Sequence, residues 1–196
     1  MNIGRNDIDW RNLSHDEIDR IIAERIEADD RRIEASGGKK PKRVGYILER
    51  IAEINNLREA DREAQDGKVK KNRFIRRHNL HPEEDLRALQ LMILTLDFPA
   101  PDYSVMKVRS DAGKVRDIVK QKYFPWRILH HAIMRVIGED IYKSLIYDTS
   151  ACIKGKGLHF GVRRMKSFLR RYSEYKWFVK TDFKKFYQSI LHELIV

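Results

Sequence analysis

The sequence predicts an α+β fold, because helical periodicity in the first part of the chain gives way to strand patterns further on. Apolar residues recur at helical spacing in residues 14–35, 44–66 and 84–96. Two strand-like runs then flank a glycine turn within residues 105–119, and a short buried strand is expected at residues 177–179. The chain has 196 residues, of which 42% are hydrophobic, so it is large enough to bury a core.

The first predicted element is a charged helix from Ser14 to Ala35. Ser14 is a good N-cap, acidic residues fill the first turn, and isoleucines form a thin apolar stripe. The segment SGGKKPKR at 36–43 is predicted to be a linker, because two glycines, a proline and four basic residues neither propagate a helix nor bury surface. We therefore divide the chain into a charged helical extension with its linker (1–43), a helical region (44–100), and a region of hairpin, helices and final strand (101–196).

The following elements have clear boundaries in the sequence. Gly67 is expected to stop the helix over 44–66, and Pro82 lies just ahead of the helix over 84–96. The run VMKVR-SDAGK-VRDIV predicts a small basic β-hairpin. An amphipathic helix with proline near its start is expected over 124–146. A glycine-lysine loop that leads into another basic helix is expected over 154–172.

The charge of the chain indicates a polyanionic partner. The sequence holds 40 Lys+Arg and 29 Asp+Glu, a formal net charge of +11. Residues 1–40 carry a net charge of −2 and residues 41–196 carry +13, so the polyanion surface is expected after residue 40. Charge alone does not separate a nucleic-acid enzyme from a ribosomal-type binder or a membrane-surface protein.

Two further features of composition bound the function. The sequence has no run of about 18 apolar residues and no signal-peptide pattern at its start, so a cytoplasmic protein without a membrane partner is expected. Cys152 is the only cysteine, which excludes a disulfide framework and a cysteine zinc site within the chain. We expect Cys152 to be a small residue packed in the interior.

A basic segment, KVKKNRFIRRHN, separates two of the predicted helices. Together with Phe74, its cations suit contact with a nucleic-acid backbone, and a solvated cationic helix face is the alternative. The candidate nucleic-acid ligands in this segment are Arg73, Arg76 and Arg77.

The segment FVKTDFKKFYQSI holds the strongest candidate for catalysis. A carboxylate at the end of a buried strand, here Asp182, is where enzymes of nucleotidyl transfer place a magnesium ligand. Two-metal catalysis of that reaction requires further carboxylates, and no later carboxylate has a comparable setting. The alternative is that Asp182 only caps the helix that follows it.

This segment resembles motif A of reverse transcriptases of the group II intron, retroelement and diversity-generating kind. In that motif a hydrophobic strand and an aspartate precede an aromatic pair and a Ser-Ile-x-His ending. The matching residues are Phe178, Val179, Asp182, Phe186, Tyr187, Ser189, Ile190 and, one residue further on than usual, His192.

Three upstream segments resemble the same family in the same order. GKVRDI at 113–118 is similar to its Gly-Lys-x-Arg-x-Ile fingers hairpin, and PWRILHHAIMRVIGEDIY at 125–142 is similar to the helix that follows it. That helix has Trp126 where the family often has aspartate and His130 where it often has glutamine. KGKGLHFGVRRMK resembles the loop before motif A, so the resemblance covers about residues 50–196 and leaves the first 45 residues unmatched.

The resemblance implies roles around a metal ion. Asp182 would be the first catalytic aspartate, and Phe183 would offer its backbone carbonyl to the metal. Tyr187 would be the aromatic gate under the sugar that disfavours ribonucleotides, with a core aromatic as the alternative. The implied ion is Mg²⁺, with Mn²⁺ as the substitute.

The resemblance also implies that the hairpin binds the nucleotide. Arg116, together with Lys107 or Arg109 on the paired strand, would hold the incoming triphosphate, because arginine suits bidentate contact with phosphate and lysine acts as a point charge. Lys114 belongs to the same group. For Lys107, Arg109 and Lys114, a solvated hairpin charge is the alternative.

The remaining candidates are expected to contact template or primer. They are Arg127, on the helix after the hairpin, and Lys154, Lys156 and His159 in the glycine-lysine loop. The loop glycines permit close backbone approach to a phosphate and equally suit a simple turn. His130 and His131 are adjacent, so they cannot form the i, i+4 pair of a zinc helix, and one of them is expected to pack.

The expected architecture is thus a helical amino-terminal region, a reverse-transcriptase fingers hairpin and the first strand of the palm. The implied activity is RNA-directed DNA synthesis from dNTPs on an RNA template with a DNA or RNA primer. We expect the chain to be an amino-terminal fragment, inactive alone, with the other catalytic aspartates beyond residue 196. The alternatives are a maturase-like RNA-binding module without catalysis and, less well matched, a basic phage DNA-binding protein. The sequence leaves open the oligomeric state and the biological role, whether in a mobile element, diversity generation or phage defence.

Overall fold

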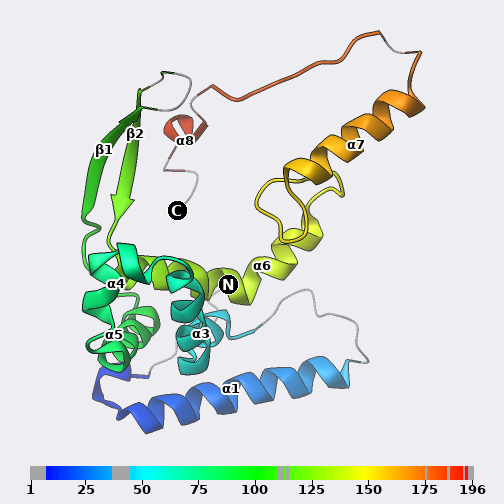
Figure 1. Ribbon diagram of the computed structural model, residues 1–196. Helices are drawn as coiled ribbons and strands as arrows, with labels where there is room; N and C mark the ends of the chain where they lie inside the picture. The colour runs from blue at the N-terminus through cyan, green and yellow to red at the C-terminus, as the bar shows by residue number, and fades with distance from the viewer. Residues whose placement is uncertain are drawn as a thin grey trace. The chain divides into compact units, whose positions relative to one another are not determined.

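The structure is a computed structural model that describes residues 8–36, 45–109, 113, 115–174, 176–184, 186–191 and 193, with the side chains of residues 71, 187 and 188 left out. It consists of helices and a two-stranded antiparallel sheet, which confirms the mixed α+β class (Figure 1). The chain divides into two compact units, Met1–Ser144 and Leu145–Val196. The first unit holds the hydrophobic core, and each unit is described separately below.

The predicted first helix is confirmed as α1, His15–Ala35, which follows a short 3-10 helix, η1, at Trp10–Asn12. Ser14 caps it in a full capping box: the Ser14 Oγ accepts from the backbone N–H of Glu17, and the Glu17 carboxylate accepts from the backbone N–H of Ser14. Its apolar stripe buries Ile18 and Ile22 in the core of the first unit. The predicted linker over 36–43 lies outside the described residues except for Ser36.

Ion pairs attach α1 to the segment that follows, among them one between Arg50 and Asp30 at 2.6 Å. The Arg25 guanidinium donates to the buried carboxylate of Glu49 at 2.7 Å, and Arg50 lies 3.2 Å from the buried carboxylate of Asp29. The backbone N–H of Gly45 also donates to Asp29, at 3.1 Å. The first two regions of the predicted division therefore share one core and a set of buried charges.

The single helix expected over 44–66 is wrong, because the structure has two, α2 at Ile47–Ala52 and α3 at Ile54–Gln65. Glu53 between them has an extended ψ of 128°. The carbonyls freed at this break keep partners, since the buried Gln90 side chain donates to Ala52 O at 3.0 Å and Asn56 donates to Ile51 O at 3.1 Å. The break therefore leaves no carbonyl of these two residues unpaired.

The core of the first unit gathers apolar side chains from helices α1 to α6 and from the short helices η1 and η3. After α3 come the 3-10 helix η2 (Val69–Lys71), α4 (Arg73–His78) and α5 (Pro82–Thr95). The helix predicted over 84–96 is present as α5, but Pro82 is its first residue and does not lie ahead of it. After the hairpin, a short π-helical turn, η3 (Tyr123–Arg127), leads into α6 (Ile128–Ser144), which packs against α3. The largest buried side chains include Ile22, Leu57, Ile75, Leu89 and Ile128.

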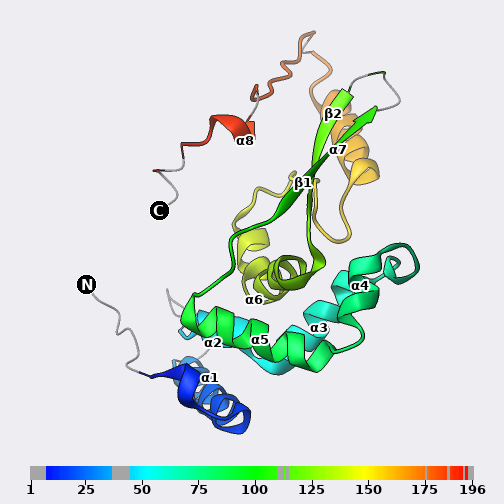
Figure 2. The same cartoon turned by 90° about the vertical axis from the view of Figure 1, so that its left-hand side faces the viewer.

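The predicted hairpin is confirmed as β1, Tyr103–Arg109, paired with β2, Val115–Gln121. Figure 2 shows it as a twisted ribbon that leaves the helices between α5 and α6. Nearly every residue of both strands is exposed, so the ribbon has two accessible faces. Neither face belongs to the core.

The second unit contains α7, Leu158–Arg171, and a short helix α8, Phe186–Ser189. The loop before α7 is held by cations on aromatic rings, because Lys156 Nζ lies 4.8 Å from the Tyr147 ring centroid and 4.9 Å from that of Phe160. Arg164 pairs with Asp148 and lies 5.1 Å from the Tyr147 ring centroid. Helix α7 buries none of its residues.

Two expectations for the chain as a whole have direct structural outcomes. Cys152, expected to be packed, is exposed and has a positive φ of 58°. The thiol therefore fills no gap in a core. Within the described part of the chain, no helix combines the length and apolar character needed to cross a membrane.

Candidate nucleotide-binding and nucleic-acid-binding surfaces

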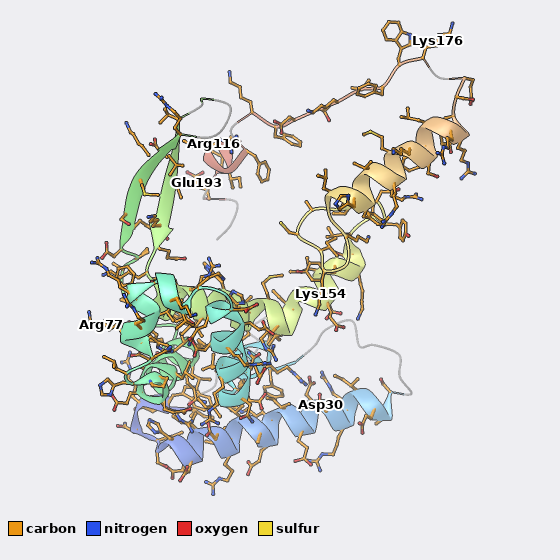
Figure 3. All side chains as sticks on the ribbon, viewed as in Figure 1. Asp30, Arg77, Arg116, Lys154, Lys176 and Glu193 are labelled. Atoms are coloured by element: carbon orange, nitrogen blue, oxygen red, sulfur yellow. The ribbon has the colours of Figure 1, made fainter. Side chains whose placement is uncertain are left out.

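The hairpin presents its cations on two different faces. Successive side chains of a strand point to opposite faces, and directly paired residues share a face. The register pairs Arg116 with Val108, and it pairs Lys107 with Asp117. Arg116 therefore lies on one face, while Lys107 and Arg109 lie on the other. Figure 3 shows Arg116 near the end of the ribbon away from the helices.

This geometry corrects one expectation. Arg116 was expected to hold a triphosphate together with Lys107 or Arg109. The register instead places Arg116 on the opposite face of the ribbon from Lys107 and Arg109. The reason is that side-chain direction follows the register of the two strands, and the turn sets that register. The separate binding role of each cation stays a prediction. Lys114 lies outside the described residues.

The hairpin cations are available to a ligand. Arg116, Lys107 and Arg109 are not buried, and none of them forms an ion pair with a carboxylate in the part of the chain that the structure describes. Lys122, just after β2, differs because it pairs with Asp102 at 2.5 Å. When an exposed cation without an internal partner binds an anion, the free-energy cost is small, because no existing ion pair has to be broken.

The segment that carries Asp182 is extended and fully exposed. The strand expected at residues 177–179 is wrong, since these residues form no strand and the Trp177 side chain is 92% exposed. A strand requires a partner for its backbone N–H and C=O groups, and the sheet of the described residues contains only β1 and β2. Asp182 and Phe183 are likewise exposed.

The N-cap alternative for Asp182 is also not what the structure has. Helix α8 begins at Phe186, four residues after Asp182, so the cap position does not fall on Asp182. The rings of Phe183 and Phe186 lie 5.9 Å apart. Tyr187 lies within α8, but its side chain and the whole of His192 lie outside the described residues.

The chemistry of Asp182 and Phe183 fits part of a magnesium site. The Asp182 carboxylate and the Phe183 backbone carbonyl are oxygen donors, the kind that Mg²⁺ prefers. Two such donors do not complete a site, and across the described residues no group of three or more His, Cys, Asp or Glu side chains could hold a metal.

The glycine-lysine loop combines a turn with one exposed cation. Gly155 and Gly157 have positive φ values of 78° and 143°, which favour glycine and support the turn interpretation. Lys156 donates to the carbonyl of Tyr147 at 2.5 Å, so its ammonium is already held within the unit. Lys154 and His159 are exposed and keep their predicted role as contacts for nucleic acid.

The basic segment forms a cationic surface over a buried histidine. In α4, Ile75 and His78 are buried, while the neighbouring arginines are exposed. The exposure of these arginines is compatible with both interpretations of the segment, contact with a nucleic-acid backbone and a solvated helix face. The exposed cations of this surface are Arg73, Arg76 and Arg77, and Arg127 at the end of η3 is exposed as well.

His78 lies in a buried polar cluster that the sequence did not predict. Its Nδ1 lies 2.7 Å from the Asp85 carboxylate, and its Nε2 lies at an ion-pair distance of 3.2 Å from Asp61 Oδ1 without forming a hydrogen bond. The Tyr123 hydroxyl donates to the same Asp61 carboxylate, and Gln65 donates to it at 2.9 Å. The cluster joins α3, α4, α5 and η3.

The cluster shifts the pKa values of His78, Asp61 and Tyr123. Burial alone would lower the pKa of His78, but the carboxylates of Asp61 and Asp85 outweigh burial and raise it. Burial would raise the pKa of Asp61, and its contacts with His78, Tyr123 and Gln65 outweigh burial and lower it. Burial and the neighbouring Asp61 carboxylate raise the pKa of Tyr123. The cluster therefore favours a charged His78 beside a charged Asp61.

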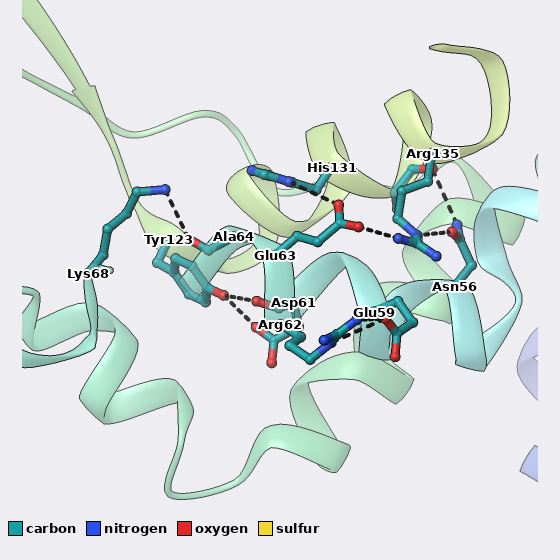
Figure 4. Close-up of polar contacts among 11 residues, drawn as sticks. Asn56, Glu59, Asp61, Arg62, Glu63, Ala64, Lys68, Tyr123, His131 and Arg135 are labelled. Carbon is teal, nitrogen blue, oxygen red and sulfur yellow. Dashed lines mark hydrogen bonds and ion pairs between the residues drawn. The ribbon is translucent and has the colours of Figure 1, made fainter. Parts of the chain in front are cut away.

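Figure 4 shows a second polar group, between α3 and α6. Glu63 accepts from Arg135 and lies 3.8 Å from His131 Nδ1, and Arg135 also donates to Asn56 at 3.1 Å. Burial and the nearby Arg127 guanidinium lower the pKa of His131. His131 is half-buried in this contact and His130 is exposed, as expected for a pair in which one ring packs.

The basic character of α7 was predicted, but its individual cations were not singled out. They recur at spacings of three, four and one residues on one side of the helix, and this spacing is visible in the sequence. The residues are Arg163, Lys166, Arg170 and Arg171, and all four are exposed.

No family model and no curated protein matches this chain.

Proposed function

We propose that this chain is the nucleotide-binding and template-binding part of an RNA-directed DNA polymerase, a reverse transcriptase. The observation that supports this most is the two-faced hairpin, which carries unpaired cations on both sides of an exposed ribbon. An exposed two-stranded ribbon is only marginally stable by itself, so its cations and apolar side chains gain most when a ligand orders them. A triphosphate and a nucleic-acid strand are ligands of that chemistry.

In this proposal the two faces bind two phosphate-bearing ligands. Arg116 contacts the triphosphate of the incoming dNTP, where its planar fork matches two phosphate oxygens. Lys107 and Arg109, on the other face, remain free for the template strand. The hairpin would thereby hold the nucleotide and the template on opposite sides of one thin element.

Asp182 and Phe183 are proposed to hold part of the metal site. A bound Mg²⁺ would supply electrostatic stabilisation of the oxygens in an in-line displacement. The carboxylate of Asp182 orients the ion, and Tyr187 limits the space beneath the sugar. Because Asp182 is a single carboxylate, the chain of residues 1–196 is expected to be inactive without further carboxylates.

A second candidate is an RNA-binding module on the same scaffold without catalysis. The exposed cations of the described residues favour this candidate. The described residues also contain no group of three or more side chains that could hold a metal ion. Both candidates bind RNA, so RNA binding does not distinguish them.

Primer extension on an RNA template with dNTPs distinguishes the two candidates. We expect extension by the full-length protein, loss of extension in Asp182→Asn, and no extension by residues 1–196 alone. RNA binding without extension by the full-length protein would leave the binding module as the better description. Robust dNTP incorporation by residues 1–196 alone would contradict the assignment of Asp182 to an incomplete two-metal site.

A further inference from the structure

Helix α7 separates its apolar and basic side chains almost completely. Its fourteen residues include no aspartate or glutamate. The apolar side occupies one arc of the helix, and its exposed members are Leu158, Val162, Met165, Phe168 and Leu169. We call the opposite side the α7 cationic stripe, which consists of Arg163, Lys166, Arg170 and Arg171.

The cationic stripe is a continuous surface. At about 1.5 Å rise per residue, Arg163 and Arg171 are separated by roughly 12 Å along the helix axis. The four cations and Ser167 line an open depression of ≈ 530 Å³ on the surface of α7. A hollow lined by four positive groups and one hydroxyl suits an anion that offers several oxygens.

The stripe differs from Arg164 and Lys156 of the same unit, because none of its four cations forms an ion pair with a described carboxylate. Arg164 is used in an ion pair with Asp148, and Lys156 lies on two aromatic rings. No carboxylate in the described part of the chain forms an ion pair with a stripe residue, and only Arg171 has a ring contact, 5.6 Å from Tyr172. Arg164 and Lys156 are thus engaged within the unit, whereas the four stripe cations are clustered on one helix and available to a partner.

We propose that the α7 cationic stripe binds the sugar-phosphate backbone of a nucleic acid. The inference rests on the proposed function for the kind of polyanion and adds a contact surface in the second unit. A strand of duplex carries one phosphate per about 3.4 Å of helix axis, so roughly 12 Å of stripe faces about three or four phosphates. Three of the four cations are arginines, whose forked guanidinium matches phosphate oxygens.

The geometry favours nucleic acid over an anionic membrane. At about 100° per residue, the centre of the stripe lies roughly 150° around the helix from the centre of the apolar side. A helix lying with its apolar side in a membrane would therefore turn Arg163 and Arg170 toward water, away from the lipid headgroups. A nucleic acid needs only the basic side.

The test compares two variants of the 196-residue chain that each lose four positive charges. The stripe variant combines Arg163→Gln, Lys166→Gln, Arg170→Gln and Arg171→Gln. The matched control combines four exposed cations of the first unit, Arg20→Gln, Arg31→Gln, Arg62→Gln and Lys143→Gln. Binding is measured by fluorescence anisotropy of labelled single-stranded RNA and of an RNA–DNA duplex at several salt concentrations.

We expect the stripe variant to lose at least tenfold in affinity, and the slope of log affinity against log salt to become shallower by roughly two to three units. The control should keep the wild-type slope. Circular dichroism checks that the helices persist, and a variant with Arg163→Lys, Arg170→Lys and Arg171→Lys should keep the slope, because it retains the charges.

Four outcomes would overturn the inference. Equal losses in stripe variant and control would show that only net charge matters. Unchanged RNA binding with lost binding to phosphatidylserine vesicles would identify a membrane surface. Failure of the wild-type chain to bind RNA would remove both this inference and the proposed function. A wild-type chain that binds RNA while the stripe variant binds equally well would remove the inference alone.

Discussion

Arg116 and Lys107 project from opposite faces of one hairpin, because Arg116 pairs with Val108 while Lys107 pairs with Asp117. A single small ligand on one face of the ribbon can therefore contact one of these cations and not the other. This relationship makes the two residues a matched pair for mutation, since both are exposed cations on the same element.

In the proposed polymerase, Arg116→Ala is expected to impair use of dNTP by about 2–3 kcal/mol, the scale of hydrogen bonds to charged groups. Steady-state kinetics with varied dNTP measure this change, while template affinity should stay near wild type. Lys107→Ala is the control, and it should leave the KM for dNTP unchanged. An unchanged KM and kcat in Arg116→Ala would refute the placement of its guanidinium on the triphosphate.

Asp182→Asn is expected to lower primer extension by several powers of ten, because it removes the charge that holds the metal but keeps the size of the side chain. Folding and RNA binding should survive, as measured by circular dichroism and anisotropy. Near-native synthesis by this variant would show that the likeness of this segment to motif A is misleading.

Tyr187→Ala is expected to leave measurable synthesis and to admit ribonucleotides, because the change removes a steric block and no metal ligand. Parallel extension assays with dNTPs and rNTPs measure the selectivity. Tyr187→Phe keeps the ring and serves as the control that should still exclude rNTPs. If sugar selection is the same in Tyr187→Ala and wild type, Tyr187 is a core aromatic.

The buried cluster predicts an alkaline loss of stability in the first unit. The pKa of His78 is raised on folding, so its contribution is complete below the ordinary histidine pKa and is lost as pH rises through the raised value. For one proton the slope is at most about 1.4 kcal/mol per pH unit. Asp61 has a lowered pKa, so its contribution is lost on the acid side instead.

Urea unfolding at about pH 6 and about pH 9 measures this dependence, because that interval brackets the histidine titration. We expect the wild-type free energy of unfolding to fall across the interval and His78→Gln to show a flatter profile. A wild-type profile as flat as that of His78→Gln would mean that His78 is not charged in the folded protein.

Gln90→Met is expected to lower the free energy of unfolding by about 1–3 kcal/mol, the cost of leaving a buried acceptor without a donor. The acceptor is the Ala52 carbonyl at the break between α2 and α3. Leu91→Met, a change of similar volume at the next position, is the control. Equal unfolding midpoints for the two variants would show that the bond to Ala52 contributes little.

The sequence predicted the features that short-range chemistry determines. Ser14 and its acidic first turn located the start of α1, and the glycine turn located both strands of the hairpin. The break at Glu53 carries no glycine or proline, and it depends on Gln90, 37 residues away, so local pattern could not reveal it. The expected strand at residues 177–179 failed because apolar composition alone does not supply a pairing partner.

The candidate site likewise has features that the sequence predicted and features that it did not. The sequence pattern placed Lys107 and Arg116 on the correct strands of the hairpin. Which face of the ribbon each cation occupies depends on the register between the strands. His78 appeared only as one residue of a basic segment, although α3, α5 and η3 bring Asp61, Asp85 and Tyr123 to its cluster. Such convergence depends on tertiary packing that no local pattern encodes.

The packing of α1 has a consequence for how this protein can be shortened or recombined. A chain that starts at residue 44, where the linker prediction suggests a module boundary, would strip Ile18 and Ile22 from the core. It would also leave the carboxylate of Glu49 buried without Arg25. Helix α1 is thus an integral part of the first unit, and replacing it with another helix would require compensating changes in the helices it covers.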